Sequence, residues 1–493
     1  MRNAKMQGTN NKTLRVLFVA AAVLMVGSCN ESGGGGGSGT DACGSAECKL
    51  TASDALFGDT FGFASAIDGD ELLIGAENHD AVGVGSGVVY AYRRVGSEYE
   101  EIQKIVPAGL APGDAFGSAI AIDGNVAVIG ARLAKDGNGS AYVFRLDAAG
   151  QWVEEQELEA SLEGREAGRG PVKGQFGRAV AISFPWIAVG APRDNFFNFL
   201  PRLKMGAVSM FEHTGTNAED PWEFDDLAGY LIPVGIPPGE LFGTSVALDG
   251  PVLAVGAVGD DEGRANSGAA FVYSLDAVLG TWTLDRKLKA VRDPLACELE
   301  PPPGPPRAPF CRAGGLNDFP DPFCDDSYAN DNFGISVAVL GDRVVVGADA
   351  RERRQQNNAC GFLTTANANA TGGAYVYTET SAGSGNWSLE VRLEPADVNN
   401  KKAFGRSLAV DTDVIAVGAF GDDDSGLFSG AAYIYRLSLD SVWALDTKLR
   451  ASDAESNDNF GISIGIDGER ALIGAWKEGD GGPQSGAAYA FDL

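Results

Sequence analysis

The sequence FGSAIAIDGNVAVIGA, residues 116–131, decides the fold. It contains two short runs rich in Ala, Val and Ile, and Asp-Gly separates them. Such runs favour β-strands, and Asp-Gly favours a two-residue hairpin turn because such turns need a positive φ. The segment therefore predicts an antiparallel hairpin that begins at Phe-Gly and ends at Gly-Ala.

The same pattern occurs seven times along the chain. Each copy begins with a Phe-Gly pair: Phe61-Gly62, Phe116-Gly117, Phe176-Gly177, Phe242-Gly243, Phe333-Gly334, Phe404-Gly405 and Phe460-Gly461. Each copy ends with a Gly-Ala pair that begins at Gly75, Gly130, Gly190, Gly256, Gly347, Gly418 or Gly474. The interval from Phe to Gly is 14 residues in all seven copies. A unit that recurs in this way indicates a repeat architecture.

Two more strand-like runs follow each hairpin. The first has the form GAAYIY, as at residues 430–435, and the second begins with an aromatic residue and ends near Lys-Leu, as at residues 443–449. Four antiparallel strands in each of seven units predict an all-β fold, a seven-bladed β-propeller of four-stranded blades. A helical solenoid is excluded because no window has a sustained period of about 3.6 residues.

The two ends of the repeat region predict how the ring closes. Lys49-Leu50 matches the end of a fourth strand, but no first three strands precede it. The last unit has three strand-like runs and ends at Leu493. We expect the N-terminal strand to pair with the last blade, which leaves no open sheet edge. The propeller then covers residues 47–493, with an insertion at about residues 292–332.

The N-terminal segment predicts export. Four basic residues precede an apolar run of eleven residues (residues 16–26), which is too short to span a bilayer and has the length of a signal-peptide core. The sequence VGSC that ends at Cys29 resembles the lipobox of bacterial lipoproteins. This resemblance implies a signal peptide over residues 1–28 and lipidation of Cys29. A plain secretory signal is the alternative.

The residues after Cys29 predict a lipid-anchored tether. Asn30 stands where an Asp favours inner-membrane retention in enterobacterial lipoproteins, so the chain resembles a lipoprotein sorted to the outer membrane. Residues 29–46 include a Gly-rich run that cannot bury apolar surface and is expected to be flexible. The predicted location is therefore the bacterial cell envelope, with lipid attachment most consistent with the outer membrane.

The remaining cysteines predict disulfide bonds. Without Cys29 their number is even, as disulfides require, and an exported location permits them. The six candidates are Cys43, Cys48, Cys297, Cys311, Cys324 and Cys360. The first two flank the closing strand and can pair with each other, whereas the other four belong to loops of the fifth repeat. Zinc is the alternative, but the sequence has no CxxC spacing.

The net negative charge of the chain argues against nucleic acids and anionic membrane surfaces as partners. The chain carries 67 acidic and 38 basic residues, a formal net charge of -29. A surface of this sign repels phosphate backbones and anionic membrane surfaces. We therefore expect no nucleic-acid partner, and contact with a membrane only through the N-terminal lipid.

The paired dipeptides at fixed spacing resemble FG-GAP repeats, found in the propellers of integrin α chains and in many bacterial surface proteins. The resemblance covers about residues 49–493 and implies a binding or adhesion role. In integrins, calcium is bound by loops of the form DxDxDGxxD between the first two strands of a blade. The 14-residue interval leaves room only for a tight turn here, as in residues 66–76, so integrin-like calcium sites are not expected at that position.

Acidic residues instead gather in the loops between strands 2 and 3 (2→3) and between one blade and the next (4→1), which leave a blade on the same face. The residues that could ligate calcium are Asp260, Asp261, Asp422, Asp423 and Asp424. Calcium coordination is one interpretation of these acids. Solvated loop charge and turn chemistry is the other, which we favour because the spacing matches no complete metal loop. No cofactor is otherwise indicated.

The same face is expected to carry the function, because long loops on a rigid scaffold are common binding sites. The only histidines, His79 and His213, are expected on opposite faces, so a Ser-His-Asp triad is poorly supported. We predict a non-enzymatic, surface- or periplasm-facing propeller that binds a protein or glycan through its 2→3 and 4→1 loops. The alternatives are a hydrolase that uses carboxylates at the channel mouth and a scaffold of an envelope assembly.

Overall fold

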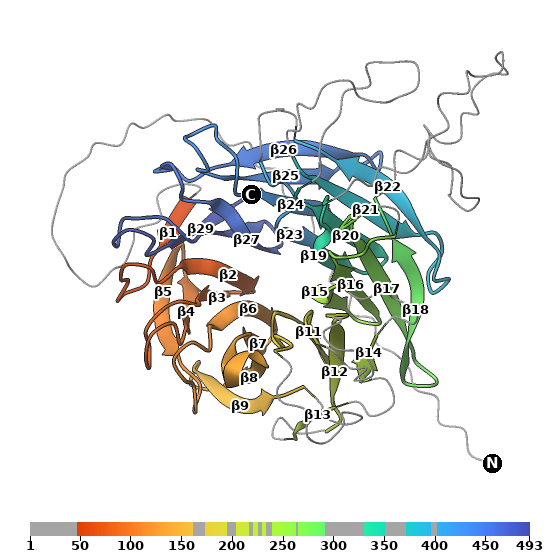
Figure 1. Ribbon diagram of the computed structural model, residues 1–493. Helices are drawn as coiled ribbons and strands as arrows, with labels where there is room; N and C mark the ends of the chain where they lie inside the picture. Colours follow the sequence, from red (N-terminus) through yellow and green to blue (C-terminus); the bar gives the residue numbers. More distant parts are fainter. Residues whose placement is uncertain are drawn as a thin grey trace. The chain divides into compact units, whose positions relative to one another are not determined.

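The computed structural model shows seven antiparallel sheets arranged as the blades of a ring (Figure 1). It describes residues 47–160, 173–194, 204–215, 220–224, 229–232, 239–262, 265–290, 330–350, 371–395 and 402–493. The predicted all-β, seven-bladed propeller is confirmed. No helix within these residues is long and apolar enough to cross a membrane. The predicted signal peptide and most of the tether lie outside the described residues.

The blades follow one another in chain order, and within each blade the strands are adjacent in sequence. Blades 1 to 3 consist of β2 (Phe61–Asp68), β3 (Glu71–Ala76), β4 (Val88–Val95) and β5 (Glu98–Ile105); β6 (Phe116–Asp123), β7 (Val126–Ala131), β8 (Ser140–Leu146) and β9 (Trp152–Leu158); and β10 (Ala179–Ser183), β11 (Trp186–Ala191), β12 (Ala207–His213), β13 (Trp222–Phe224) and β14 (Tyr230–Leu231). The helical turn α1 (Ala134–Gly137) lies between β7 and β8.

The other four blades repeat this arrangement. Blades 4 and 5 consist of β15 (Phe242–Asp249), β16 (Val252–Ala257), β17 (Ala269–Asp276) and β18 (Thr281–Leu288), and of β19 (Phe333–Leu340), β20 (Arg343–Ala348), β21 (Gly373–Glu379) and β22 (Trp387–Leu393). Blades 6 and 7 consist of β23 (Leu408–Asp411), β24 (Val414–Ala419), β25 (Ala431–Leu437) and β26 (Trp443–Leu449), and of β27 (Phe460–Asp467), β28 (Arg470–Ala475), β29 (Ala487–Asp492) and β1 (Glu47–Leu50).

The ring closes as the sequence predicts. The strand β1 pairs antiparallel with β29, with Lys49 opposite Tyr489 and Leu50 opposite Ala488. The first strand of each blade contacts the first strand of the next, from β2 to β27 and back to β2. These seven strands therefore surround the axis of the ring, and the fourth strands form its outside (Figure 1).

Glycines allow the backbones of neighbouring blades to touch. The glycine that precedes strand 3 of each blade forms a parallel bridge to the phenylalanine of the next Phe-Gly pair, as between Gly87 and Phe116. The Phe-Gly glycine has a positive φ, 86° at Gly117. A Cβ at Gly75 would overlap the carbonyl oxygen of Gly117. The recurrence of glycine at these positions therefore reflects close approach of two backbones.

The repeated phenylalanines fill the space between blades. Phe116 is fully buried and belongs to a cluster that includes Leu73 and Val89 of blade 1 together with Tyr142 of its own blade. The rings of Phe116 and Tyr142 meet edge to face, with centroids 5.6 Å apart. The expectation that these phenylalanines are core residues is confirmed.

The turns between strands 1 and 2 connect neighbouring blades at one end of the ring. All seven turns have two residues, as at Gly69-Asp70, and Gly69 has a φ of 57°. The carboxylate at the end of strand 1 often accepts a hydrogen bond from the next blade's turn, as Asp249 Oδ2 does from Gly341 N at 2.6 Å. The recurrent Asp therefore joins neighbouring blades as well as preceding a turn.

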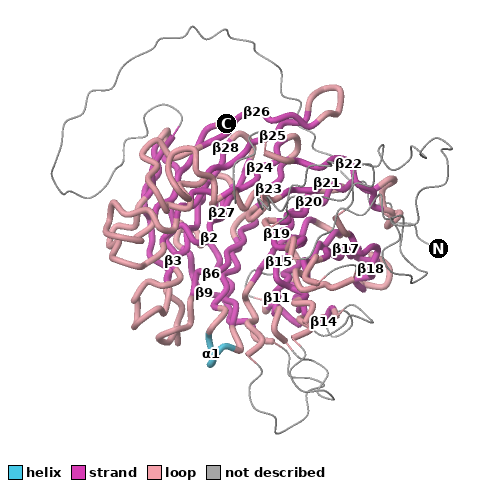
Figure 2. The backbone as a smooth tube through the Cα atoms, turned by 45° about the horizontal axis from the view of Figure 1, so that its top comes forward, coloured by secondary structure: helices cyan, strands magenta, loops and turns pink. Residues whose placement is uncertain are grey.

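The loops that join strand 2 to strand 3 are less uniform. They range from eight residues between β7 and β8 to 24 between β20 and β21. Together with the 4→1 connections they leave the sheets at the end opposite the two-residue turns (Figure 2, loops in pink). We call this end of the ring the loop face. The predicted insertion falls between β18 and β19, and residues 291–329 lie outside the described part of the chain.

The close approach of blades makes a testable difference between two glycines of blade 2. A Cβ at Gly130 would overlap the carbonyl oxygen of Gly177 on blade 3, whereas a Cβ at Gly124 would meet nothing within 4 Å. We expect Gly130→Ala to lower the free energy of unfolding by about 3 kcal/mol, because two backbones must separate. Gly124→Ala, which only forces alanine into a positive φ, should cost about 1 kcal/mol. Urea denaturation measures both, and equal losses would contradict the close-approach explanation.

Candidate functional site on the loop face

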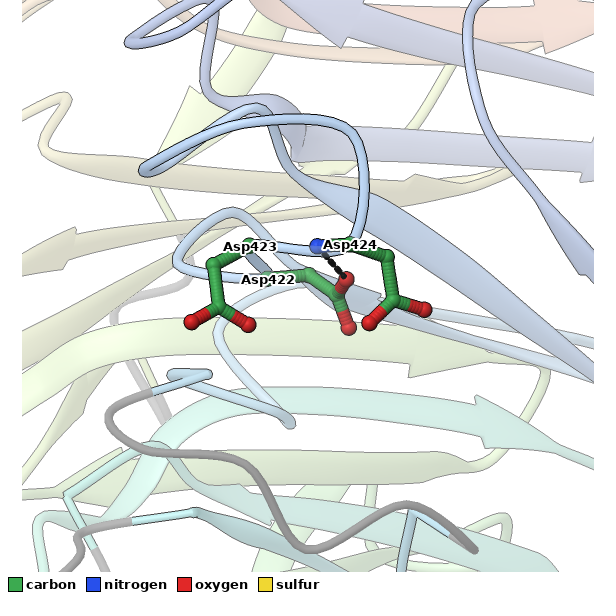
Figure 3. A group of neighbouring side chains, drawn as sticks. All are labelled: Asp422, Asp423 and Asp424. Carbon is green, nitrogen blue, oxygen red and sulfur yellow. Dashed lines mark hydrogen bonds between the residues drawn. The ribbon is translucent and has the colours of Figure 1, made fainter.

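The loop face brings acidic side chains together, as the sequence predicts. On blade 6, carboxylate oxygens of Asp422, Asp423 and Asp424 lie within 4.8 Å of one another (Figure 3). The backbone N–H of Asp424 donates a hydrogen bond to Oδ1 of Asp422, at 3.1 Å. A second group of this kind, on blade 7, consists of Asp453, Glu478 and Asp480.

Lysines neutralise the blade 6 group. The ammonium groups of Lys402 and Lys448 lie 2.6 and 2.8 Å from Oδ2 of Asp422, and the Tyr433 hydroxyl donates to the same oxygen at 2.9 Å. The side chains of Asp422 and Lys402 are both completely buried. Burial would raise the pKa of Asp422, but hydrogen bonds from Lys402 and Lys448 outweigh it and lower that pKa below its usual value.

The same arrangement holds on blade 4. Asp260 is completely buried and forms an ion pair with Lys287, whose ammonium also lies 2.7 Å from Glu262. The neighbouring Asp261 accepts a hydrogen bond from the backbone N–H of Asn266 at 2.6 Å. Of the predicted ligands, Asp260 therefore pairs with a lysine, and Asp261 stabilises a turn.

On blade 7 the cation comes from the closing strand. The Lys49 ammonium lies 2.6 Å from Asp453, 3.2 Å from Glu478 and 2.5 Å from Asp480. A side-chain ammonium thus lies among the carboxylates of each cluster, where a bound metal ion would have to compete with it. This arrangement favours ion pairing and turn chemistry over calcium coordination on this face.

These clusters occupy equivalent places in their blades. The fourth residue after the glycine of Gly-Ala carries the central acid, and its carbonyl accepts a hydrogen bond from the glycine before strand 3, as Asp422 does from Gly430 at 2.9 Å. The lysine comes from the Lys-Leu pair of strand 4. The sequence shows Lys-Leu in three of the seven repeats, but the role of its lysine as the partner of a loop carboxylate was missed.

A second set of acids lies two residues before Phe-Gly. They are buried and belong to the 4→1 connections: Asp59, Asp114, Glu240, Asp331 and Asp458. Three of them accept a backbone hydrogen bond from the third residue upstream, as Asp114 does from Ala111 at 2.8 Å. Their positions fit turn chemistry rather than a solvated charge. In blade 6 this place is taken by Lys402, which explains why Asp422 has two lysine partners.

Within this second set of acids, Glu240 of blade 4 has a strongly raised pKa. Glu240 is completely buried, and burial, together with the hydrogen bond and the negative charge of Asp260, raises the pKa of Glu240 to about 8. Lys287 opposes this shift, but it also neutralises Asp260. Glu240 is therefore mostly protonated at neutral pH.

A family model described as FG-GAP repeat matches six segments: residues 45–92, 99–144, 231–273, 324–377, 387–435 and 443–491. These segments cover more than half of the chain. The chain belongs to the FG-GAP repeat family. No curated protein matches it. The family match accounts for six of the seven blades of this FG-GAP propeller, and blade 3 is the one that the match omits.

Blade 3 differs from the others in its outer edge. Its fourth strand is divided into β13 and β14, both of which pair with β12. Its Phe176 is nonetheless completely buried, and Gly139 forms the inter-blade bridge to it. The inner part of the FG-GAP unit is therefore retained where the outer part has diverged.

The two-residue 1→2 turns leave no room for a calcium loop of the integrin form in any blade of this FG-GAP propeller. His79 is buried on the loop face, 3.6 Å from Asp54 and 3.9 Å from Asp59, whereas His213 ends β12 near the opposite face, beside Trp222. The expected separation of the two histidines is confirmed.

The closing strand carries the only candidate cysteine within the described residues. Cys48 is 5% exposed and is not a free thiol. The other five candidates and the lipidation residue Cys29 lie outside the part of the chain that the structure describes. The pairing of Cys43 with Cys48 therefore stays a prediction.

The raised pKa of Glu240 predicts a pH-dependent stability. Between pH 4.5 and about 8 the unfolded carboxyl group ionises while the folded one keeps its proton, so the folded state binds more protons. The free energy of unfolding should therefore fall as pH rises through this window. Glu240→Gln, which is neutral at every pH, should remove this part of the slope in urea denaturation at pH 5 and pH 8.

Glu262→Gln is the matched control for that experiment. Glu262 is on the same loop face, but its side chain is 64% exposed, and hydrogen bonds from Lys287 and Lys289 lower its pKa. It titrates below the window, so its replacement should leave the slope between pH 5 and pH 8 unchanged. A Glu240→Gln protein with the wild-type slope would show that Glu240 is ionised in the folded state.

Proposed function

We propose that this chain is a lipid-anchored, non-catalytic binding propeller of the bacterial cell envelope, which recognises a protein or glycan through its loop face. The observation that carries the proposal is the contrast between the two ends of the ring. The 1→2 turns have two residues in every blade, whereas the 2→3 loops vary threefold in length. The 3→4 turns at the same end as the 1→2 turns have at most eight residues, so the long connections lie on the loop face. Long loops gathered on one face of a rigid scaffold are the usual arrangement of a binding surface.

Exposed apolar side chains on the loop face support this proposal. Phe57 is 73% exposed, Val84 78% and Leu427 62%, and each lies in a 4→1 or 2→3 loop at a boundary between blades. Isolated apolar residues such as Leu439 are also exposed in the 3→4 turns, so exposure alone does not select the face. On the loop face, apolar side chains stand beside the ion-paired clusters, which is the mixture typical of protein and glycan interfaces.

The ion pairs support a non-catalytic role. A glycosidase needs two facing carboxylates, one ionised and one protonated, that can both reach the substrate. On the loop face, Asp260 and Asp422 are completely buried and paired with lysines, and Asp114 and Asp458 accept backbone hydrogen bonds. These contacts hold the clustered acids in structural roles and leave the loops themselves as the surface for a partner.

The choice of face is testable with matched surface variants. Phe57→Asp with Val84→Asp changes the loop face, and Val278→Asp with Leu439→Asp changes the 3→4 turns by the same charge. A glycan array and cross-linking to fractionated envelope proteins identify the ligand, and its Kd is then measured for each variant. We expect the loop-face pair to weaken binding roughly tenfold or more and the control pair to leave it within about twofold. Loss of affinity in the control alone would assign binding to the other face.

The anchor is tested at Cys29. Metabolic labelling with a radioactive or clickable palmitate should label the wild-type chain and place it in the membrane fraction. Cys29→Ala should remove the label and release the chain, because stable anchoring by acyl chains requires the modified residue. Labelling that persists in Cys29→Ala would contradict lipidation at this residue, and an unlabelled wild-type chain that is nevertheless exported would favour the plain secretory signal.

A further inference from the structure

Four arginines lie at the loop-face ends of strands 1 and 2 in blades 2, 3 and 6. Arg178 and Arg406 each lie two residues after the phenylalanine of Phe-Gly, just before the inner strands β10 and β23, which begin at Ala179 and Leu408. Arg132 and Arg193 follow the second strands β7 and β11. Burial and the positive charges of Arg406, Arg132 and Arg193 lower the pKa of Arg178 to about 10, although Glu77 opposes them.

The positions of these residues in the ring place them around the axis. Arg178 belongs to blade 3 and Arg406 to blade 6, which are not neighbours, so their side chains interact only across the axis. Two of the arginines are partly neutralised at the rim. Arg132 makes a bidentate ion pair with Glu77 of blade 1, at 3.0 Å for both contacts, and Arg406 lies 3.3 Å from Asp349 of blade 5.

The other two guanidinium groups have no partner of this kind. Within the described residues, no carboxylate pairs with Arg178 or Arg193, and no side-chain hydrogen bond reaches their guanidinium nitrogens. Arg178 is half-buried, so its charge is partly removed from water. Unpaired, partly desolvated like charges destabilise a fold. In a chain with a net charge of -29, such a cluster is the reverse of what the composition favours.

We propose that this cluster of Arg132, Arg178, Arg193 and Arg406 binds an oxyanion, a carboxylate, phosphate or sulfate group of a ligand that enters the axis from the loop face. The planar guanidinium fork matches these groups with two parallel hydrogen bonds. Four guanidinium groups oppose two carboxylates, Glu77 and Asp349, so the site keeps a local positive charge. Arg178 is the central residue because it interacts with all three other arginines.

Two aromatic residues of other blades occupy positions equivalent to those of the arginines. Phe63 occupies the place of Arg178 on blade 1, and Trp476 occupies the place of Arg132 on blade 7, with their rings edge to face at 5.8 Å. The indole N–H of Trp476 is buried and makes no hydrogen bond within the described residues. The end of the axis therefore offers both charge and an aromatic surface, which suits an oxyanion attached to a ring-shaped or aliphatic body.

The inference deepens the proposed function, and rests on it for the face at which the ligand arrives. An anion titration does not need the natural partner, so the two proposals fail separately. The purified chain is titrated with sodium sulfate, sodium phosphate and sodium glucuronate, each against sodium chloride at equal ionic strength. Melting temperature and isothermal titration report binding. The three salts separate sulfate, phosphate and carboxylate as the preferred group.

Arg178→Gln is the decisive variant. We expect it to weaken binding of the preferred anion at least tenfold and to raise the melting temperature without anion, because it removes an unpaired charge. Arg178→Lys keeps the charge without the fork and should bind with intermediate affinity. Arg436→Gln is the control, since Arg436 pairs with Glu469 at the opposite face and its loss removes the same charge.

Three results would overturn the proposal. Wild type and Arg178→Gln could respond equally to all three salts. Their response would then be only the general stabilising effect of sulfate and phosphate on folded proteins, with no specific site. A lower melting temperature of Arg178→Gln would show that Arg178 has a structural partner. Weakened binding in Arg436→Gln of the same size would assign the effect to net charge rather than to the arginine cluster.

Discussion

The structure depends on direct contact between the backbones of neighbouring blades. At every junction a Phe-Gly carbonyl lies where a Cβ of the preceding Gly-Ala glycine would be, and the glycine before strand 3 bridges to the same phenylalanine. No larger residue fits, so the distance from Phe-Gly to Gly-Ala cannot change without moving the junction. This constraint fixes the 14-residue interval between Phe-Gly and Gly-Ala, so changes in length fall outside this hairpin, above all in the 2→3 and 4→1 loops that adjoin it.

This is why the fold could be predicted from the sequence and the blade count was correct. The glycines, the Asp-Gly turns and the alternating apolar runs are local features, each needed in every copy, and seven copies give seven independent readings of one pattern. The closing strand was predictable for the same reason, because Lys49-Leu50 has the composition of a fourth strand without the three that precede one. Blade 3 shows the limit of the pattern, since its divided fourth strand keeps only the inner features.

The candidate site was only partly predictable. The sequence placed Asp260 and Asp422 correctly on one face, but it did not show that Lys287 and Lys448 neutralise them. Each lysine lies more than 20 residues along the chain from its acid, and whether it points toward the loop depends on the register of strand 4. Lys402 is harder still, because it replaces an acid found at the same place in other blades. The arginine cluster was missed because its members come from separate blades that only the closed ring brings together.

The two kinds of charged group on the loop face follow one electrostatic rule. In blades 4, 6 and 7, a buried loop acid is matched by a lysine from strand 4 of the same blade, which neutralises its charge. Arg178 and Arg193 lack such a partner within the described residues, although acidic residues are far more abundant in this chain. The net negative charge is screened over about 8 Å at physiological ionic strength, so a ligand oxyanion at the axis responds mainly to the guanidinium groups in contact with it. A local positive site can therefore select an anion that the rest of the surface repels, and the repulsion limits binding to ligands that reach the axis itself.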